Sequence, residues 1–359
     1  MAGYIRTYVH RYAGRIKETK DGVRTILKLE GEQEMSVMTM VKAINNALDI
    51  KLDEDKSIVI YGEDVGVEGG VFRVTEGLQQ KYGADRVFDS PLAESGIVGT
   101  ALGMAVSGLR PIVELQFEGF TFPAFNQILS NVSRMRNRSR GKYAVPLVIR
   151  FPYGGGVNAL EHHSDSPEAL FAHIPGLKVV IPSTPHDAKG LMISAIESND
   201  PVIFMEPKRV YRAIKQEVSE EKFTLPLGKA KVVLEGTDIT VVAFGAMIRE
   251  CQKAIAMARE AGISVELIDL RSIYPIDRET IRNSVRKTGR MIVVAEAHES
   301  FSVGSELIAV ANEEAFLYLE APPRRVMGFD TIVPLAQGEK YYIISPDRIF
   351  YEIEKSVKF

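Results

Sequence analysis

Hydrophobic residues between positions 35 and 207 fall into two kinds of block. Short, nearly continuous apolar runs, such as residues 57–64 (SIVIYGED), are typical of strands that are buried on both faces of a sheet. Between these runs lie stretches with apolar residues at helical spacing, such as residues 38–52 (MTMVKAINNALDIKL). Because strands and helices alternate, the pattern predicts a parallel sheet with helices on both faces, which is an α/β domain.

The same pattern repeats in a second α/β unit over residues 229–359, after a polar, extended segment at 208–228 that we interpret as a linker. In the first unit the expected strands are residues 57–64, 86–90, 110–117, 145–152, 178–184 and 201–207, and the expected helices are residues 38–52, the segment after Glu94, 123–137 and 186–198. In the second unit the expected strands are residues 238–246, 264–273, 290–298 and 324–330, with a helix at 248–262.

Residues 1–34 differ from the rest of the chain. They are basic, with no acid before Glu18, and one helical face would carry Tyr4, Tyr8, Tyr12 and Ile16. Organellar targeting peptides are amphipathic, rich in arginine and poor in acids, which would place the protein in the mitochondrial matrix. The first 17 residues contain no serine, however, so a genuine arm, or a working chain that begins near Met35, is an equally open interpretation.

Composition excludes several classes of protein. With 45% hydrophobic and 25% charged residues, the chain has the make-up of an ordinary soluble protein. A net charge of -3 argues against a nucleic-acid binder, and the longest apolar stretch is too short for a membrane span of ~20 residues. The one cysteine, Cys251, cannot form an internal disulfide, so we expect a reducing compartment such as the cytoplasm.

Polar residues gather where the strands of the first unit are expected to end. In an open parallel sheet, ligands bind in the crevice beyond the carboxyl ends of the strands. Glu63 and Asp64, Glu94, residues 116–118 and the loop around His163 occupy such positions, and all of them belong to the first unit. The sequence therefore predicts that the functional site lies there.

Glu94 has two interpretations. It could be an acid at a helix start, where the helix dipole stabilises it by about 0.3–1 kcal/mol. Alternatively, it is a carboxylate in a poorly solvated pocket whose pKa is raised for proton exchange. The helix that follows it has small residues at four-residue intervals, which favours close packing either between chains or within the domain: Gly99, Gly103 and Ser107, with Ala101 and Ala105.

The segment 161–176 contains His162, His163 and His173. The two adjacent histidines and Asp165 do not form a familiar zinc spacing, and no cysteine is near. We expect His173, on the apolar face of a short helix, to be a core residue. A histidine that orients a substrate or moves protons is the alternative for the loop, which follows three glycines but lacks the spacing of a P-loop or a dinucleotide fold. We expect His298, in the second unit, to lie at a surface or an interface.

From about Met35 onward the chain resembles the beta subunit of the thiamine-diphosphate-dependent component of 2-oxo acid dehydrogenase complexes, the part that decarboxylates pyruvate or branched-chain 2-oxo acids. The resemblance rests on six motifs in the same order, at residues 59–78, 86–99, 114–128, 162–191, 200–212 and 267–277. It implies an N-terminal domain of the pyrimidine-binding type and a C-terminal domain of the transketolase type.

The resemblance also implies roles for individual residues. Glu94 matches the acid that hydrogen-bonds N1′ of the aminopyrimidine and so assists proton loss from C2 of the thiazolium. His163, rather than His162, matches the histidine that orients the lipoyl group and handles protons. The other matches are Glu63 and Leu92 at the pyrimidine, Gln116 and Phe117 beside cofactor and substrate, and Phe120 stacked on the pyrimidine, where branched-chain relatives often have tyrosine.

Metals and partners are implied in the same way. The carbonyl groups of Leu147 and Ala195, with Ser198 and Asp200, match a potassium site, although relatives commonly have aspartate in place of Ser198. The Gly-Asp-Gly motif that holds Mg²⁺ and the diphosphate is absent from this sequence. The resemblance places that motif on a separate alpha subunit, so it implies an α2β2 heterotetramer in which this chain is inactive alone. The C-terminal unit would dock the lipoylated acyltransferase core.

These features lead to a first hypothesis: oxidative decarboxylation of a small 2-oxo acid, with acyl transfer to lipoyl groups. Residues 163–169 and 206–212 favour a branched-chain substrate of the 2-oxoisovalerate type, whereas residues 117–120 favour pyruvate or acetoin forms, which we keep as the alternative. A non-catalytic assembly subunit and a self-sufficient transketolase-type enzyme are rival hypotheses. No nucleic-acid or membrane partner is expected.

Overall fold

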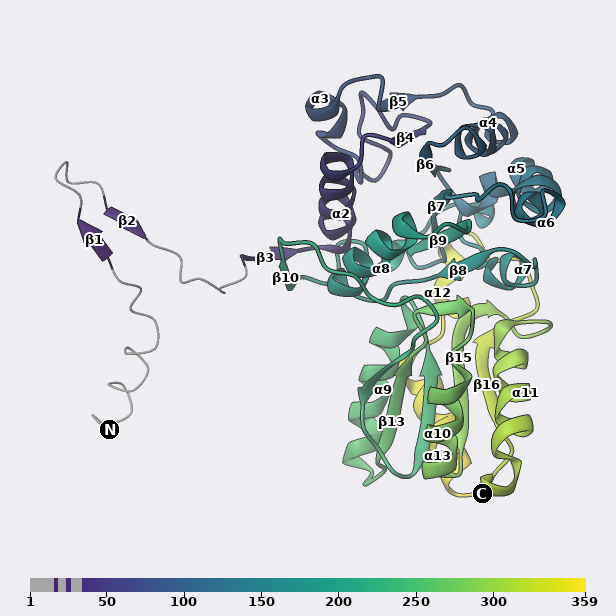
Figure 1. Cartoon of the computed structure of the whole chain (residues 1–359). Helices are drawn as coiled ribbons and strands as arrows, with labels where there is room; N and C mark the ends of the chain where they lie inside the picture. The colour runs from purple at the N-terminus through teal and green to yellow at the C-terminus, as the bar shows by residue number, and fades with distance from the viewer. Residues whose placement is uncertain (1–15, 19–23, 27–33) are drawn as a thin grey trace.

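The computed structural model describes residues 16–18, 24–26 and 34–359 of the 359-residue chain. Two α/β domains are stacked on one another, with the N-terminal domain above the C-terminal one in the view of Figure 1. The segment for which a targeting role was considered, residues 1–34, lies almost wholly outside the described residues. Its described parts, β1 (Ile16–Glu18) and β2 (Arg24–Ile26), pair as antiparallel strands.

The first domain is built on a seven-stranded sheet in which all but one strand are parallel. The strand order is β14 (Ser272–Tyr274), β8 (Lys178–Val180), β9 (Val202–Pro207), β7 (Val148–Tyr153), β6 (Arg110–Glu114), β4 (Ile58–Gly62) and β5 (Val87–Asp89). The exception is β14, which pairs antiparallel with β8.

Helices cover both faces of this sheet because each central strand is apolar on both sides. Successive side chains point to opposite faces, and accordingly Ile60 and Tyr61 belong to two different hydrophobic clusters. The first cluster includes residues of α2 (Met40–Glu54) and α8 (Pro185–Glu197), and the second includes residues of α4 (Glu94–Val106), α5 (Thr121–Gln127) and α7 (Glu168–Ala172).

The second domain has a five-stranded sheet. Its order is β11 (Lys231–Leu234), β13 (Val265–Asp269), β12 (Ile239–Ala243), β15 (Met291–His298) and β16 (Arg324–Gly328), with only β11 antiparallel. The helices of this domain are α9 (Met247–Glu260), α10 (Arg278–Thr288), α11 (Val303–Ala315), α12 (Ala336–Tyr342) and α13 (Pro346–Val357). The expected fold class, two α/β domains with parallel sheets, is confirmed.

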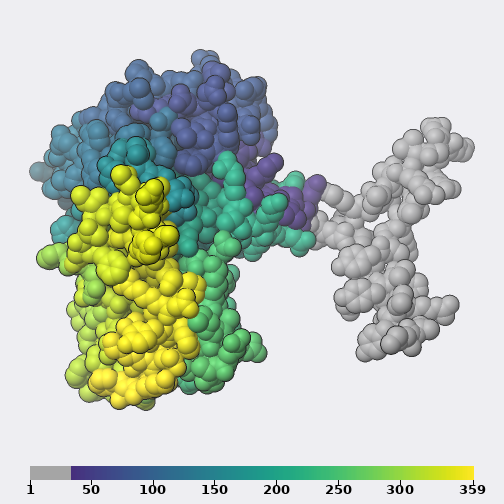
Figure 2. Space-filling view, turned by 180° about the vertical axis from the view of Figure 1, so that it is seen from behind, coloured from purple at the N-terminus to yellow at the C-terminus, as the bar shows by residue number. Residues whose placement is uncertain are grey.

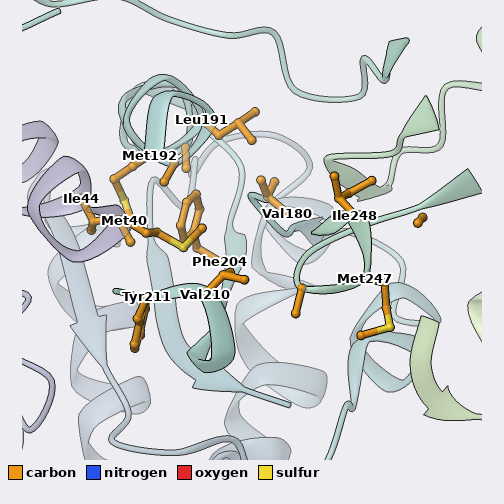
Figure 3. Close-up of a cluster of buried hydrophobic side chains, with 14 of the residues drawn as sticks. Met40, Ile44, Val180, Leu191, Met192, Phe204, Val210, Tyr211, Met247 and Ile248 are labelled. Carbon is orange, nitrogen blue, oxygen red and sulfur yellow. The ribbon is translucent and has the colours of Figure 1, made fainter. Parts of the chain in front are cut away.

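One hydrophobic cluster runs through both domains. Figure 3 shows Val180 and Leu191 of the first domain in the same cluster as Met247 and Ile248, which begin α9 of the second domain. All four side chains are almost fully buried. Buried apolar area stabilises by about 25 cal/mol per Å², so this shared core holds the two domains together.

Three details differ from the sequence prediction. The segment 264–273, expected as one strand, forms β13 in the second sheet and β14 in the first, with Arg271 between them in the left-handed region at φ 57°. The expected linker contains β10 (Gln216–Ser219), which pairs with β3 (Met35–Met38). The expectation of a core position for His173 is wrong: this residue follows the five-residue helix α7 and is exposed.

Candidate active site at the strand ends of the first domain

Acidic residues meet at the carboxyl ends of β4 and β6, as the sequence predicts. Gln116 donates a hydrogen bond from Nε2 to Oδ2 of Asp64 at 2.8 Å, which joins the two strand ends. Between them Glu63 is 2% exposed, and neither of its carboxylate oxygens has a hydrogen-bond partner within the described part of the chain. Buried polar atoms are nearly always paired, so these two oxygens indicate a place for a polar ligand.

Burial raises the pKa of Glu63 to about 7, and the nearby charges of Glu94 and Asp64 add to this effect. Glu94 is the first residue of α4 and is partly exposed, with its carboxylate close enough to repel that of Glu63. The first turn of α4 is fixed to β4 because the Tyr61 hydroxyl donates to the carbonyl of Ile97 at 2.7 Å. The structure therefore brings the two predicted acids together on rigid elements.

A second part of the site consists of rings. The imidazole of His163 stacks on Phe117, with ring centroids 4.0 Å apart, and meets Phe120 edge to face at 5.1 Å. Nδ1 of His163 is buried and has no hydrogen-bond partner among the described residues. Burial lowers the pKa of His163, and the neighbouring His162 lowers it further, so the imidazole is neutral at neutral pH.

The backbone of His163 is held by a buried ion pair. Nζ of Lys208 donates to both carboxylate oxygens of Glu118, at 3.0 and 2.9 Å, and also to the carbonyl oxygen of His163. Burial raises the pKa of Glu118 to about 7 and lowers that of Lys208, because removal from water disfavours the charge on each partner. The pair links β6, β9 and the histidine loop at one point.

A buried arginine on β7 joins the ends of the neighbouring strands β6 and β9. Nε and Nη2 of Arg150 donate to the two oxygens of Glu206 at 2.6 and 2.7 Å, and Nη1 pairs with Glu114. The Tyr211 hydroxyl donates to Glu206 at 2.6 Å. Phe72 packs against both Tyr211 and Phe117, so this network is continuous with the ring cluster.

Two predicted positions stand apart from this centre. Leu92 is 81% exposed, which leaves its side chain open to a partner from outside the chain. The potassium set is engaged internally: Ser198 Oγ accepts from Lys178 Nζ at 3.0 Å, and the Asp200 carboxylate lies 3.5 Å from the same ammonium group and pairs with Arg136.

The carbonyl groups of that set each accept a backbone hydrogen bond. Leu147 O accepts from Val202 N at 2.9 Å, and Ala195 O accepts from Ser198 N at 3.2 Å. An ammonium and a guanidinium group pair with the Asp200 carboxylate in this arrangement, and the potassium site stays a prediction. Within the described residues there is also no cluster of three or more histidine, cysteine or acidic side chains suited to a metal.

Sequence reasoning missed Lys208, Phe72 and Arg150. Lys208 was assigned to the start of the linker, although it directly follows the strand β9. Its position at the carboxyl edge of a parallel strand was the signal that could have placed it in the site.

Acids at the strand ends of one α/β domain, with a second α/β domain beneath, define a fold of the thiamine-dependent transketolase class. The family described as "Transketolase, pyrimidine binding domain" matches residues 36–214, and "Transketolase, C-terminal domain" matches residues 228–349. A solved structure titled "Split gene transketolase, inactive beta4 tetramer" aligns with a TM-score of 0.74 and 23% identity, over 89% of this chain and 98% of that one.

Curated relatives are more specific. The chain is 58% identical to "Pyruvate dehydrogenase E1 component subunit beta" of Acholeplasma laidlawii, over 90% of this chain and 99% of that protein. It is 51% identical to the protein of the same name in Staphylococcus aureus, over 90% of this chain and all of that protein. The chain belongs to the family of beta subunits of thiamine-diphosphate-dependent 2-oxo acid dehydrogenases.

The relatives' names do not support the branched-chain preference that the motifs suggested; they support the pyruvate alternative. Of the residues that the structure describes, no helix is long and apolar enough to cross a bilayer.

Proposed function

We propose that this chain is the beta subunit of a pyruvate dehydrogenase component and forms the pyrimidine half of its thiamine-diphosphate site. The observation that carries the proposal is the buried, unpartnered carboxylate of Glu63 next to Glu94 at the strand ends. The proposed substrate is pyruvate, because relatives at 58% and 51% identity bear that name. The proposed product is an acyl group that passes to a lipoyl group.

Thiamine diphosphate, when bound, supplies the electron sink that decarboxylation of a 2-oxo acid requires. Glu94 would accept a hydrogen bond from the aminopyrimidine, and that bond would be stronger once the ligand and its partner exclude water from this partly exposed carboxylate. Because burial raises the pKa of Glu63 to about 7, this acid carries only part of a negative charge at neutral pH, which weakens its repulsion of Glu94. Gln116 holds the neighbouring Asp64 carboxylate by a hydrogen bond.

His163 would act on the acyl acceptor. Its neutral imidazole has an unpaired Nδ1 that can accept a proton, and the rings of Phe117 and Phe120 fix its orientation. We propose that it orients the lipoyl group and relays a proton to the sulfur that is set free when the lipoyl disulfide opens. The Phe120 ring, which lacks a hydroxyl, would present only its apolar face to the cofactor.

An alpha subunit is proposed as the partner that holds Mg²⁺ and the diphosphate in an α2β2 assembly. The face of α4 that carries Gly103 supports this: a methyl group added at Gly103 would meet no atom within 4 Å among the described residues outside its own stretch of helix backbone. The opposite residues, Ala101 and Ala105, are buried within the domain. The small residues thus serve packing on one side and leave an open face for another subunit on the other. Docking of a lipoylated acyltransferase core is proposed for the second domain.

The test uses this chain reconstituted with its alpha partner. We expect faster carbon dioxide release from pyruvate than from 2-oxoisovalerate, and a loss of about 10²–10⁴-fold in turnover for Glu94→Gln, the range for a group that assists proton transfer. Glu76→Gln, at an exposed acid in the same domain, is the control and should retain full activity. Unchanged turnover of Glu94→Gln would favour a non-catalytic assembly subunit, and faster release from 2-oxoisovalerate would overturn the substrate.

A further inference from the structure

A single carboxylate of the second domain holds the loop that leads to His163. The loop follows β7 and runs from Gly154 to the short helix at Glu161–His163. At its tip, Gly156 N and Asn158 N donate to Oε1 and Oε2 of Glu339, at 2.7 and 2.8 Å. Glu339 lies on α12, which Figure 1 places where the two domains meet. Figure 2 shows the C-terminal residues, in yellow, reaching up against the first domain.

The conformation of the tip explains why it needs such a partner. Gly156 and Asn158 both have positive φ angles, 89° and 56°, so their N–H groups point to one side rather than into a regular element. N–H groups that converge in this way form a concave site for an anion. The Glu339 side chain is 2% exposed and accepts both, which makes these charge-assisted bonds that water cannot easily replace.

The loop also packs closely against Arg209. A Cβ atom at Gly156 would lie 2.7 Å from Cδ of Arg209, and one at Gly155 would lie 3.1 Å from Oε1 of Glu339. Arg209 follows Lys208, which holds the carbonyl of His163. The loop is therefore anchored twice: at its tip by the second domain, and at His163 by the first.

We propose that Glu339 is a positioning residue that fixes the loop 154–163 and thereby keeps His163 stacked on Phe117. This gives the second domain a part in the chemistry of the first, in addition to assembly. The role assigned to His163 rests on the proposed function, whereas the clamp itself rests only on the contacts of Glu339.

The first measurement is amide hydrogen exchange in the assembled αβ complex, which requires no turnover. In Glu339→Ala the peptides that cover residues 155–160 should exchange at least about tenfold faster than in the wild type, since bonds to a charged group contribute about one order of magnitude or more each. Glu339→Gln, which retains the shape but loses the charge, should lie between the two. The control is Glu266→Gln, another buried acid of the second domain, which lies beside Lys287 and should leave these peptides unchanged.

The second measurement separates the two halves of the reaction. Decarboxylation is followed with an artificial electron acceptor, and acyl transfer is followed with a lipoyl domain. Glu339→Ala should slow acyl transfer about tenfold or more while it affects the dye-linked rate far less, as His163→Ala should. If Glu339 acts through His163, the double variant should be no slower than His163→Ala alone.

Unchanged exchange in both Glu339 variants would overturn the clamp. Faster exchange with normal acyl transfer, or a double variant in which the two losses multiply, would overturn the positioning role. A wild-type complex that decarboxylates no 2-oxo acid would instead overturn the proposed function, and the exchange measurement would still decide the fate of the clamp.

Discussion

Glu168, at the start of α7, is a buried acid whose charge opposes folding. Its side chain is 0% exposed, and neither carboxylate oxygen has a hydrogen-bond partner in the described structure. Burial raises its pKa to about 8, and the charge of Glu296 contributes in the same direction. We expect Glu168→Gln, which mimics the protonated acid in shape and lacks its ionisation, to stabilise the protein at neutral pH.

The size of the effect follows from the two pKa values of Glu168. In the unfolded chain the acid ionises near its ordinary value of 4.5, and in the folded protein near 8. The folded state binds the proton of Glu168 more tightly than the unfolded state does. The contribution of Glu168 to the free energy of unfolding is therefore highest below about pH 4.5, falls as pH rises, and levels off above about pH 8. At 1.36 kcal/mol for each pH unit, the full loss is at most ~5 kcal/mol, and at pH 7 it is about 3 kcal/mol.

The assay is chemical denaturation of wild type and Glu168→Gln between pH 5 and pH 8.5. The variant should gain less than about 1 kcal/mol at pH 5 and about 3 kcal/mol at pH 7, with no further gain above about pH 8. Glu354→Gln, at a partly exposed acid paired with Lys358, should show no such dependence on pH. A variant that is less stable than the wild type at pH 8, or a difference that stays constant with pH, would refute the reasoning.

Two further predictions concern the cations of the first domain. Arg150→Met leaves the buried carboxylate of Glu114 without its cation and Glu206 with only the hydroxyl of Tyr211, so we expect a loss of about 3–5 kcal/mol at pH 7 in denaturation experiments. The loss should be smaller at pH 5, because burial raises the pKa of Glu114 and so favours its protonated form as pH falls. Lys178 already contacts Ser198 and Asp200 of the predicted potassium site. Thermal unfolding should therefore give the same Tm in KCl and NaCl at equal ionic strength. A Tm that is raised only by K⁺ would show that the ion displaces the lysine.

Much of the fold could be predicted because hydrophobic spacing is a local property. Runs such as residues 145–152 and 201–207 are apolar on both faces, and the structure makes them the central strands β7 and β9. The segment 264–273 shows where this reasoning stops. It is split by Arg271, whose guanidinium group donates to Asp187 of α8 at 2.6 Å in the other domain, a contact between positions 84 residues apart. No local pattern encodes that contact.

The acids of the site could be predicted for a similar reason: Glu63 and Gln116 follow strands, and the topology of a parallel sheet brings strand ends to one edge. Residues that contact a segment far away in the sequence could not be predicted in this way. Glu339 is about 180 positions away from the loop that it holds, and it sits in a helix of seven residues, too short to show a clear period. The error at His173 has the same origin, since α7 has only five residues.

The contacts of Glu339 and the buried acids near them make the junction between the two domains sensitive to pH. Burial raises the pKa of Glu296 to about 7, and a Cβ atom at Gly154, the first residue of the histidine loop, would lie 2.5 Å from its carboxylate. Two cations lie near Glu296. Arg209 pairs with Glu250 at 3.1 Å and lies 3.9 Å from Glu296, and Lys208 is paired with Glu118. As pH rises above 7, ionisation of Glu168 and Glu296 adds negative charge near this loop. The loop is held by a third carboxylate, that of Glu339. Alkaline pH is therefore the direction in which the junction weakens, and His163 should lose its fixed position before either domain unfolds, because its loop is the segment that these charges meet.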